Sequence, residues 1–377
     1  MISKHPHIII VGAGIVGASL TYHLVCQNAR VTLIDKAPKP ANDVTEKSFA
    51  WINVVHDAPE AYINLRQQAI ADWHRVEDEL NGQLKVDWSG ALTWFEDTLE
   101  TERIASKLIN FGYQARLVDQ QEIRLLEPNL KNVPAQAMFA KNEGAIDPTL
   151  TTELFVKAAG EASADIQLGN EVLSFMTNGS RITGVVTANG NLTADIVVLT
   201  AGANTTTLCR QIDLILPINI SPAILMNFHS NHRFVNRIIS NPFMEVRAAS
   251  NTLTLTAEDY IDESIENNPQ AIAQRTLKKI KTHWQDAEQI KLTNVMVGRR
   301  PIPQDGLPII GRITHIDGLY LLVMHAGVTL AAIAGRLAAH EILSGRDNVL
   351  LSSYRPKRFN QFKVKDFTLV NEFTVIN

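Results

Sequence analysis

Three glycines near the N-terminus stand in a GxGxxG pattern at Gly12, Gly14 and Gly17, and Asp35 follows 23 residues after Gly12. The first glycine of such a pattern permits a tight turn, the second lets backbone N–H groups approach a pyrophosphate, and the third lets the next helix pack closely. The N-terminus of that helix favours negative charge. An acid at the position of Asp35 accepts hydrogen bonds from an adenosine ribose. The pattern therefore predicts dinucleotide binding and leaves NAD and FAD both open.

The residues around this loop predict a βαβ unit that positions it. Residues 7–11 and 30–35 are continuous apolar strands, and residues 18–26 between them have helical character. Such strands are typical of a parallel sheet that is covered on both faces. Enzymes that pass electrons from NAD(P)H to a flavin commonly have two such loops, and this sequence contains one. The chain is therefore expected to bind NAD alone, or to bind FAD and take electrons directly from its substrate.

The rest of the chain alternates between helical and β-rich stretches. Asn178-Gly179 and Asn189-Gly190 are hairpin signals between strands. Helices are predicted over 59–81, 98–127 (with a break at Gly112-Tyr113), 149–163, 268–286 and 328–343, and strands over 88–95, 171–176, 182–188, 195–199 and 319–323, with a β-rich region from 217 to 262.

This order predicts an α/β fold in which a nucleotide domain is assembled from separated segments. A Rossmann-like nucleotide-binding domain is expected to comprise residues 1–85, 141–216 and 301–377. Residues 86–140 and 217–300 are expected to form an inserted, β-rich α+β domain that binds the substrate.

Composition excludes several classes of protein. The 377 residues are 45% hydrophobic and 20% charged, the balance of a globular protein with a sizeable core. The net charge is −4 and no basic block stands out, so no nucleic-acid partner is expected. No uninterrupted apolar run reaches ~18 residues, so any membrane contact is expected to be peripheral. With only Cys26 and Cys209, we predict no disulfide framework and no metal site, and the cytoplasm is the expected compartment.

Several short segments, in order along most of the chain, resemble the FAD-dependent amine and D-amino acid oxidase family, which includes glycine oxidase, sarcosine oxidase and D-amino acid dehydrogenases. The longest and most specific is residues 298–311 (GRRPIPQDGLPIIG). Glu46 departs from the resemblance, because the family has a glycine or another small residue there, and a different backbone path near the pyrophosphate is expected. The other matching segments are residues 12–17 with Asp35-Lys36, 45–53, 126–128, 144–148, 194–203 and 325–331.

The resemblance implies that the cofactor is FAD and that it is bound non-covalently. Cys26 and Cys209 lie at neither of the places where relatives attach the flavin. The N–H groups of residues 327–330 would stabilise negative charge on the reduced flavin ring. The implied cofactor contacts are Gly12, Ala13, Gly14, Ile15, Val16, Gly17, Asp35, Lys36, Ser48, Phe49, Ala50, Trp51, Val172, Ala201, Gly202, Gly298, Gly327, Val328, Thr329 and Leu330.

Three residues are the candidates for contact with the reacting substrate. Arg300 matches the family's substrate-carboxylate arginine, and a guanidinium offers a planar fork to two carboxylate oxygens. The alternative role for Arg300 is to form a structural ion pair. The adjacent Arg299 is better suited to that role, because neighbouring residues on a strand face opposite ways. Trp51 is expected to wall the flavin. Tyr260 would bind the substrate carboxylate or act as a lid. Alternatively, its side chain would only pack against the helix predicted over 268–286.

The expected function is oxidation of a C–N bond in an amino acid or secondary amine with a free carboxylate, by hydride transfer to flavin N5. Oxygen, a quinone or another carrier would reoxidise the flavin. Two alternatives stay open: an NAD-dependent dehydrogenase with a single Rossmann loop, and a non-catalytic flavin-binding subunit of a multi-subunit dehydrogenase. Neither the particular substrate nor the oligomeric state, with a homo-oligomer among the options, follows from the sequence.

Overall fold

The predicted βαβ unit lies at the centre of the first of two large sheets. The computed structural model describes residues 6–54, 57–260 and 264–359. In it, β1 (His7–Val11) pairs in parallel with β2 (Arg30–Asp35) on one side and with β12 (Ile196–Leu199) on the other. The nine-stranded sheet has the order β11-β10-β19-β12-β1-β2-β8, with β18 beside β19 and β9 beside β10. Its other strands are β8 (Asp165–Leu168), β9 (Val172–Asn178), β10 (Arg181–Thr187), β11 (Gly190–Thr193), β18 (Ile309–Ile313) and β19 (Ile316–Val323).

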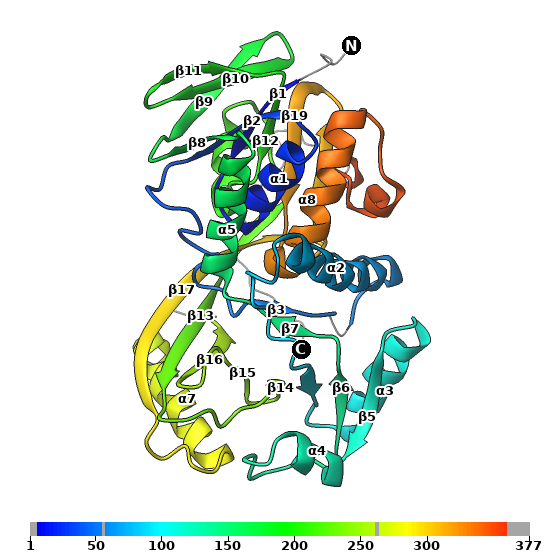
Figure 1. Ribbon diagram of the computed structural model, residues 1–377, viewed down its shortest axis with the longest axis vertical. Coiled ribbons are helices and arrows are strands. Elements are labelled where there is room, and N and C mark those ends of the chain that lie inside the picture. Colours follow the sequence, from blue (N-terminus) through cyan, green and yellow to red (C-terminus); the bar gives the residue numbers. More distant parts are fainter. Residues whose placement is uncertain (1–5, 55–56, 261–263, 360–377) are drawn as a thin grey trace.

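Both faces of this sheet are covered, which explains the continuous apolar run of β1. Ile8 and Ile10 belong to a cluster with the helices on one face. Ile9 and Val11 belong to a second cluster with β9, β10 and α6 (Thr205–Arg210). In Figure 1 helices α1 (Ile15–Val25), α5 (Pro148–Glu161) and α8 (Gly327–Ser344) lie together against the first face.

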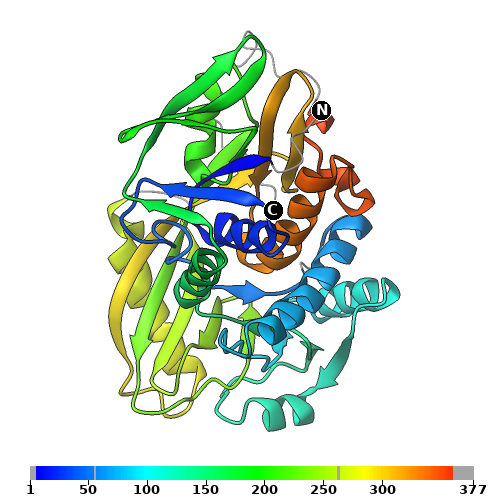
Figure 2. The same ribbon diagram turned by 45° about the horizontal axis from the view of Figure 1, so that its top comes forward.

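The second sheet is built from two stretches of the chain that lie far apart in sequence. Its eight strands have the order β17-β13-β16-β15-β14-β4-β6-β5. The long strands β13 and β17 pair side by side and run up to the first sheet (Figure 1, Figure 2). The strands are β4 (Ala91–Thr93), β5 (Ala115–Asp119), β6 (Gln136–Ala140), β13 (Ile218–His229), β14 (Ile238–Asn241), β15 (Met244–Ala248), β16 (Leu253–Asp259) and β17 (Lys291–Pro303).

Side-chain caps begin some of the helices and are absent from others. Asp97, Asp147 and Asn268 accept hydrogen bonds from the first backbone N–H groups of α3 (Thr98–Asn110), α5 and α7 (Pro269–His283). By contrast, α1 and α8 have neither a side-chain cap nor an acid in their first turns. The remaining elements are α2 (Glu60–Glu79), α4 (Gln120–Leu126), the short strands β3 (Trp51–Ile52) and β7 (Gly144–Ala145), and the 3₁₀ turns η1 (Gly202–Asn204), η2 (Ile265–Asn267), η3 (Val349–Tyr354) and η4 (Pro356–Arg358).

The α/β fold class is confirmed, and one stretch of secondary structure differs from the sequence prediction. Residues 98–127 are not helical around a single break, because β5 separates α3 from α4. Gly112 adopts a φ of 76° just after α3, and β5 then pairs with β6 along its whole length. Only Val118 of β5 is buried, so the strand has little apolar pattern of its own. Pairing with a distant strand, rather than local preference, decides its conformation. Among the described residues, none of the helices is long and apolar enough to span a membrane.

Candidate functional site

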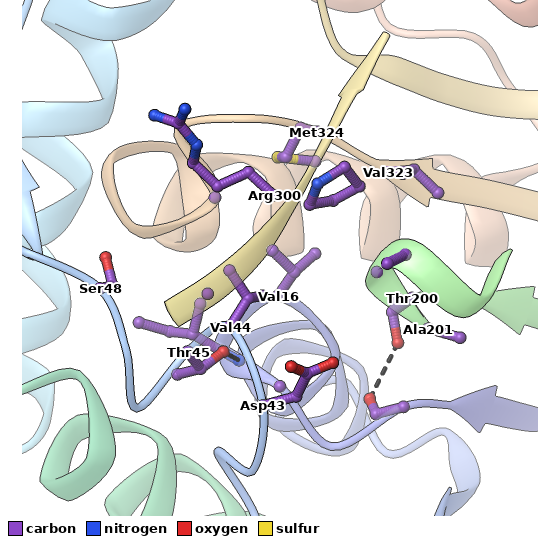
Figure 3. Close-up of a pocket in the computed structure, with 18 of the residues that line it drawn as sticks. Val16, Asp43, Val44, Thr45, Ser48, Thr200, Ala201, Arg300, Val323 and Met324 are labelled. Carbon is purple, nitrogen blue, oxygen red and sulfur yellow. Dashed lines mark hydrogen bonds between the residues drawn. The ribbon is translucent and has the colours of Figure 1, made fainter. Parts of the chain in front are cut away.

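A cavity of about 670 Å³ is lined by residues of both sheets. This volume lies within the ~300–1,000 Å³ that is usual for ligand pockets. The wall from the first sheet comes from the loops that follow β1, β2 and β12, and the opposite wall comes from β13, β15, β16 and β17. Residues 42–45 and 47–51 and the start of α8 also line the cavity. Figure 3 shows Asp43, Thr45, Ser48, Thr200 and Arg300 around this space.

Two glycines of the glycine loop cannot be replaced by larger residues, because the backbone around them is crowded. A Cβ on Gly12, whose φ is 113°, would lie 2.7 Å from the carbonyl oxygen of Thr200. A Cβ on Gly17 would lie 2.0 Å from the carbonyl oxygen of Gly12. The loop leads into the uncapped N-terminus of α1, where Ile15 N donates to Thr45 Oγ1 at 3.3 Å. The remaining N–H donors of this turn are suited to a phosphate.

Asp35 lies at the end of β2 and lines the cavity next to the loop. Its Oδ2 accepts a hydrogen bond from Ala13 N at 2.6 Å, and its Oδ1 accepts one from Ala37 N at 2.8 Å. These bonds fix the carboxylate and use the N–H group of Ala13. A carboxylate has about four lone-pair sites, so acceptor capacity is left for ribose hydroxyls.

Glu46 does not line the cavity, and the different backbone path expected near the pyrophosphate stays a prediction. Its carboxylate turns to Lys39, 3.2 Å from the ammonium, and it does not line the cavity. Its neighbours Thr45 and Lys47 do line it. The departure from the family pattern is therefore accommodated by an ion pair at the edge of the loop.

The uncapped N-terminus of α8 also opens on the cavity. Ala326 precedes α8 in the left-handed conformation at a φ of 57°, and Gly327, Val328 and Thr329 line the space. Thr329 Oγ1 donates to the carbonyl oxygen of Trp51 at 3.0 Å, which ties the strand that carries Trp51 to this helix. The N–H groups of the first turn of α8 can stabilise negative charge.

Arg66 of α2 is a site residue that the sequence analysis missed. It lines the cavity while its side chain is buried, with Nε donating to the carbonyl oxygen of Asn53 at 2.9 Å and Nη1 to Tyr62 Oη at 3.3 Å. The signal that could have identified it is its position on the apolar stripe of α2, between Ile63 and Ile70. A charged residue on a buried stripe needs polar partners, and such residues often belong to a site.

Arg300 of β17 lines the cavity, and its guanidinium makes contacts on one side only. Nη2 donates to Asp259 Oδ1 at 2.6 Å and to Ser221 Oγ at 2.9 Å, and Nε donates to the carbonyl oxygen of Ser221 at 3.3 Å. Nη1 donates to none of the residues that the structure describes. Arg299 is exposed and lies outside this cavity, because neighbouring strand residues alternate between faces. Figure 3 shows Arg300 pointing away from the glycine loop.

Two further titratable groups in the lining were not predicted. Burial raises the pKa of Glu245 to about 7; the nearby Asp259 raises it further and Arg300 opposes the shift. Burial also lowers the pKa of His325 to about 4, with Arg300 and Arg66 acting in the same direction. The imidazole is therefore uncharged near neutral pH. Neither residue has a spacing in the sequence that marks it.

Tyr260 does not line the cavity. It directly follows Asp259 and packs against the apolar cluster between the second sheet and α7, which corresponds to the alternative that the sequence left open.

Ala13, Gly17 and Leu330 also lie outside the lining. Gly17 instead provides the close contact within the glycine loop, and Leu330 is buried in the helix cluster. The predicted residues that line the cavity are Gly12, Gly14, Ile15, Val16, Asp35, Lys36, Ser48, Phe49, Ala50, Trp51, Val172, Ala201, Gly202, Gly298, Arg300, Gly327, Val328 and Thr329.

These residues fit FAD. The crowded glycine loop and the first turn of α1 suit a pyrophosphate, and Asp35 suits the ribose of an adenosine. The distant first turn of α8 offers a second place for negative charge, as the reduced flavin ring requires. Segments between Val11 and Thr329 that lie far apart along the chain converge on this cavity.

The comparisons with known proteins agree with this geometry. A family model described as FAD dependent oxidoreductase matches residues 7–341. Glycine oxidase of Pseudomonas aeruginosa is 23% identical over 357 residues, which cover 91% of this chain and 96% of that protein. D-amino acid dehydrogenase of Neisseria meningitidis is 21% identical over 408 residues, covering 92% and 97%. Among solved structures, L-proline dehydrogenase from P. horikoshii has a TM-score of 0.84 at 20% identity, covering 95% of this chain and 99% of that one. Because the family model spans most of the chain, this protein belongs to the DAO family of FAD-dependent oxidoreductases.

Proposed function

We propose that the protein oxidises the C–N bond of an amino acid or secondary amine that bears a free carboxylate, using non-covalent FAD. The observation that carries this proposal is the position of Arg300. Its guanidinium lines the cavity that also holds the glycine loop and the start of α8, and its Nη1 is left without a partner among the described residues. Relatives named glycine oxidase and D-amino acid dehydrogenase act on substrates of this kind.

Arg300 would bind and orient the substrate through its carboxylate. The contacts of Nε and Nη2 with Ser221 hold the guanidinium plane in place before the substrate arrives. A planar fork that is already oriented loses little entropy when it forms two bonds to a carboxylate. Asp259 shares Nη2, so a carboxylate that binds to both terminal nitrogens must displace or share that contact.

When bound, FAD supplies a hydride acceptor at flavin N5. The protein's own contribution is then orientation and electrostatics. Trp51 and Thr329 hold the strand beside the cavity against α8, and the N–H groups at the start of that helix would stabilise negative charge on a bound flavin. An amine that binds in its neutral form requires no strong base. His325, which is uncharged near neutral pH, adds no positive charge next to Arg300.

The test is anaerobic absorption spectroscopy of the purified holoenzyme. Acid denaturation should release FAD into solution, as non-covalent binding requires. Titration with glycine, sarcosine, proline and the D- and L-forms of larger amino acids should bleach the flavin band near ~450 nm for at least one compound. Readmission of air then separates an oxidase, which recovers its colour at once, from a dehydrogenase that needs a quinone or another carrier. A yellow protein that none of these compounds bleaches would contradict the proposal.

A further inference from the structure

Arg66 is a buried cation in the cavity wall, and within the part of the chain that the structure describes it forms no ion pair. The residue is only 4% exposed. The hydrogen bonds that its guanidinium donates there all end on uncharged oxygen atoms, which belong to Asn53, Tyr62 and Thr329. Burial of a charge without a counter-charge is costly. Its place in a cavity wall therefore indicates a ligand that carries negative charge.

The same hydrogen bonds indicate how Arg66 can act on that ligand. Nε and Nη2 donate to the main-chain and side-chain oxygens of Asn53, Nη2 also donates to Thr329 Oγ1 at 3.4 Å, and Nη1 donates to Tyr62 Oη at 3.3 Å. A guanidinium has five N–H groups, so a single one is left without an acceptor among the described residues. A fork to two carboxylate oxygens needs two N–H groups. Arg66 is therefore suited to act as a fixed charge, whereas Arg300 has an uncommitted Nη1 for a carboxylate.

A second source of positive potential lies beside this guanidinium. Thr329, which accepts the hydrogen bond from Arg66, is the third residue of α8, and α8 begins with neither a side-chain cap nor an acid in its first turn. The N–H groups of that turn and the helix dipole act on the same end of the cavity as Arg66. Trp73 of α2 donates from Nε1 to the carbonyl oxygens of Val328 and Thr329 at 3.1 and 2.9 Å, which holds the two helices together.

The buried acid nearby, Glu143, does not cancel the charge of Arg66. Its carboxylate accepts hydrogen bonds from Val54 N at 2.9 Å and from Tyr113 Oη at 2.7 Å. Burial raises the pKa of Glu143 to about 7, although these hydrogen bonds and the charge of Arg66 oppose the shift. A large fraction of this carboxyl group is therefore protonated near neutral pH, and this end of the cavity keeps an excess of positive charge.

We propose that Arg66 is a fixed positive charge that stabilises the reduced, negatively charged form of the bound flavin and so raises its reduction potential. A hydride brings two electrons and one proton, so the ring gains one negative charge when it accepts one. A cation that is already held in place stabilises this charge without reorganisation at the moment of reaction. The inference depends on the FAD cofactor and on no particular substrate, so it stands or fails independently of the proposed function.

The midpoint potential of the bound flavin, measured without substrate, tests this charge. Holoenzyme is titrated with dithionite against a reference dye, and the FAD content is measured first. Arg66→Gln keeps a hydrogen-bond donor and removes the charge, whereas Arg66→Lys keeps the charge and loses the shape of the guanidinium. Arg66→Gln should lower the preference for reduced over oxidised FAD by ~10- to 100-fold, which is ~30–60 mV for a two-electron couple. Arg66→Lys should stay within about threefold of the wild type.

Arg336→Gln is the matched control. Arg336 also lies close to α2 and α8, since it belongs to α8 and its Nη2 donates to Asp72 Oδ2 of α2 at 2.7 Å. It does not line the cavity. This variant should have the midpoint potential of the wild type, because the arginine that it removes is already paired with a carboxylate outside the site.

Binding of hexanoate separates the cofactor from the substrate as the partner of Arg66. Hexanoate carries a carboxylate and no amine, and its binding is followed by perturbation of the oxidised flavin spectrum. Arg66→Gln should bind it within about threefold of the wild type, because Arg300 is the carboxylate anchor. Binding weakened ~10-fold or more at an unchanged potential would assign Arg66 to the substrate and overturn the inference.

The potentials themselves can also overturn it. A wild-type potential in Arg66→Gln with full FAD content would show that the charge of Arg66 does not act on the flavin. A ~10-fold drop in the preference for reduced FAD in Arg66→Lys would show that the guanidinium matters for its shape and not for its charge. This second result decides the question even if Arg66→Gln retains no FAD.

Discussion

Replacement of Arg300 by methionine tests the carboxylate anchor directly. The change keeps most of the side-chain volume and removes every donor of the guanidinium. The partner left behind, Asp259, has a side chain that is 68% exposed. Because its carboxylate remains in contact with water, the lost ion pair should change the free energy of unfolding by no more than about 1 kcal/mol. A loss of binding can therefore be separated from a loss of folding.

The expected effect on ligand binding is much larger than the effect on folding. A carboxylate held by two charge-assisted hydrogen bonds gains a net ~2–4 kcal/mol over one held by none. The dissociation constant for hexanoate, and KM for an amino acid substrate, should thus rise by ~30- to 1,000-fold. Asp259→Asn is the comparison variant. It removes a carboxylate that competes for Nη2 of Arg300, so binding should become tighter by at most about fivefold.

The assay is a spectral titration of the holoenzyme with hexanoate, with the FAD content of each preparation measured first. Arg300→Met should retain FAD, because the glycine loop and Asp35 lie elsewhere in the cavity. Hexanoate binding within threefold of the wild type in Arg300→Met with full FAD content would refute the role of Arg300. Weaker binding in Asp259→Asn would show that Asp259 orients the guanidinium and does not compete for it.

Three further outcomes are expected. Gly17→Ala should yield a protein with little or no bound FAD, because the new Cβ would lie 2.0 Å from the carbonyl oxygen of Gly12; full FAD content by absorbance would contradict this. Burial raises the pKa of Glu143 from 4.5 to about 7, so the folded state retains its proton to a higher pH than the unfolded state. The wild type should lose ~1.4 kcal/mol per pH unit from this group as pH rises from about 4.5 to 7. Denaturant titrations of Glu143→Gln should show a correspondingly flatter stability profile, whereas parallel profiles would disprove the assignment. Glu341→Ala should reduce the free energy of unfolding by ~3–5 kcal/mol, because it leaves the buried guanidinium of Arg355 without its carboxylate; a loss under 1 kcal/mol would count against this.

The cofactor end of the site was predictable because its requirements are local in the sequence. Gly12, Gly14 and Gly17 lie on one turn, and the backbone crowding at that turn tolerates no side chain at Gly12 or Gly17. Asp35 ends the very next strand. The alternation of Arg299 and Arg300 is likewise a property of a single strand, so the sequence could indicate that they face opposite ways, and the family resemblance favoured Arg300 for the cavity.

Other parts of the site could not be predicted from local pattern. Tyr260 directly follows the last residue of β16, and its side chain packs in the apolar cluster that includes residues of α7 instead of lining the cavity. Arg66 lies on a helix whose pattern is that of an ordinary amphipathic helix. The short strand β5 shows the same limit for secondary structure, since its partner β6 lies some twenty residues away.

The sequence by itself determined the βαβ unit, the binding of a dinucleotide and the opposite orientations of Arg299 and Arg300, because each depends on backbone geometry and periodicity within one or two consecutive elements. Only the tertiary structure decided that Glu245, Arg66 and His325 share a cavity with Arg300. These residues come from a strand, a helix and a loop that are far apart along the chain. Their burial, and with it the raised pKa of Glu245 and the lowered pKa of His325, exists only when the two sheets are brought together.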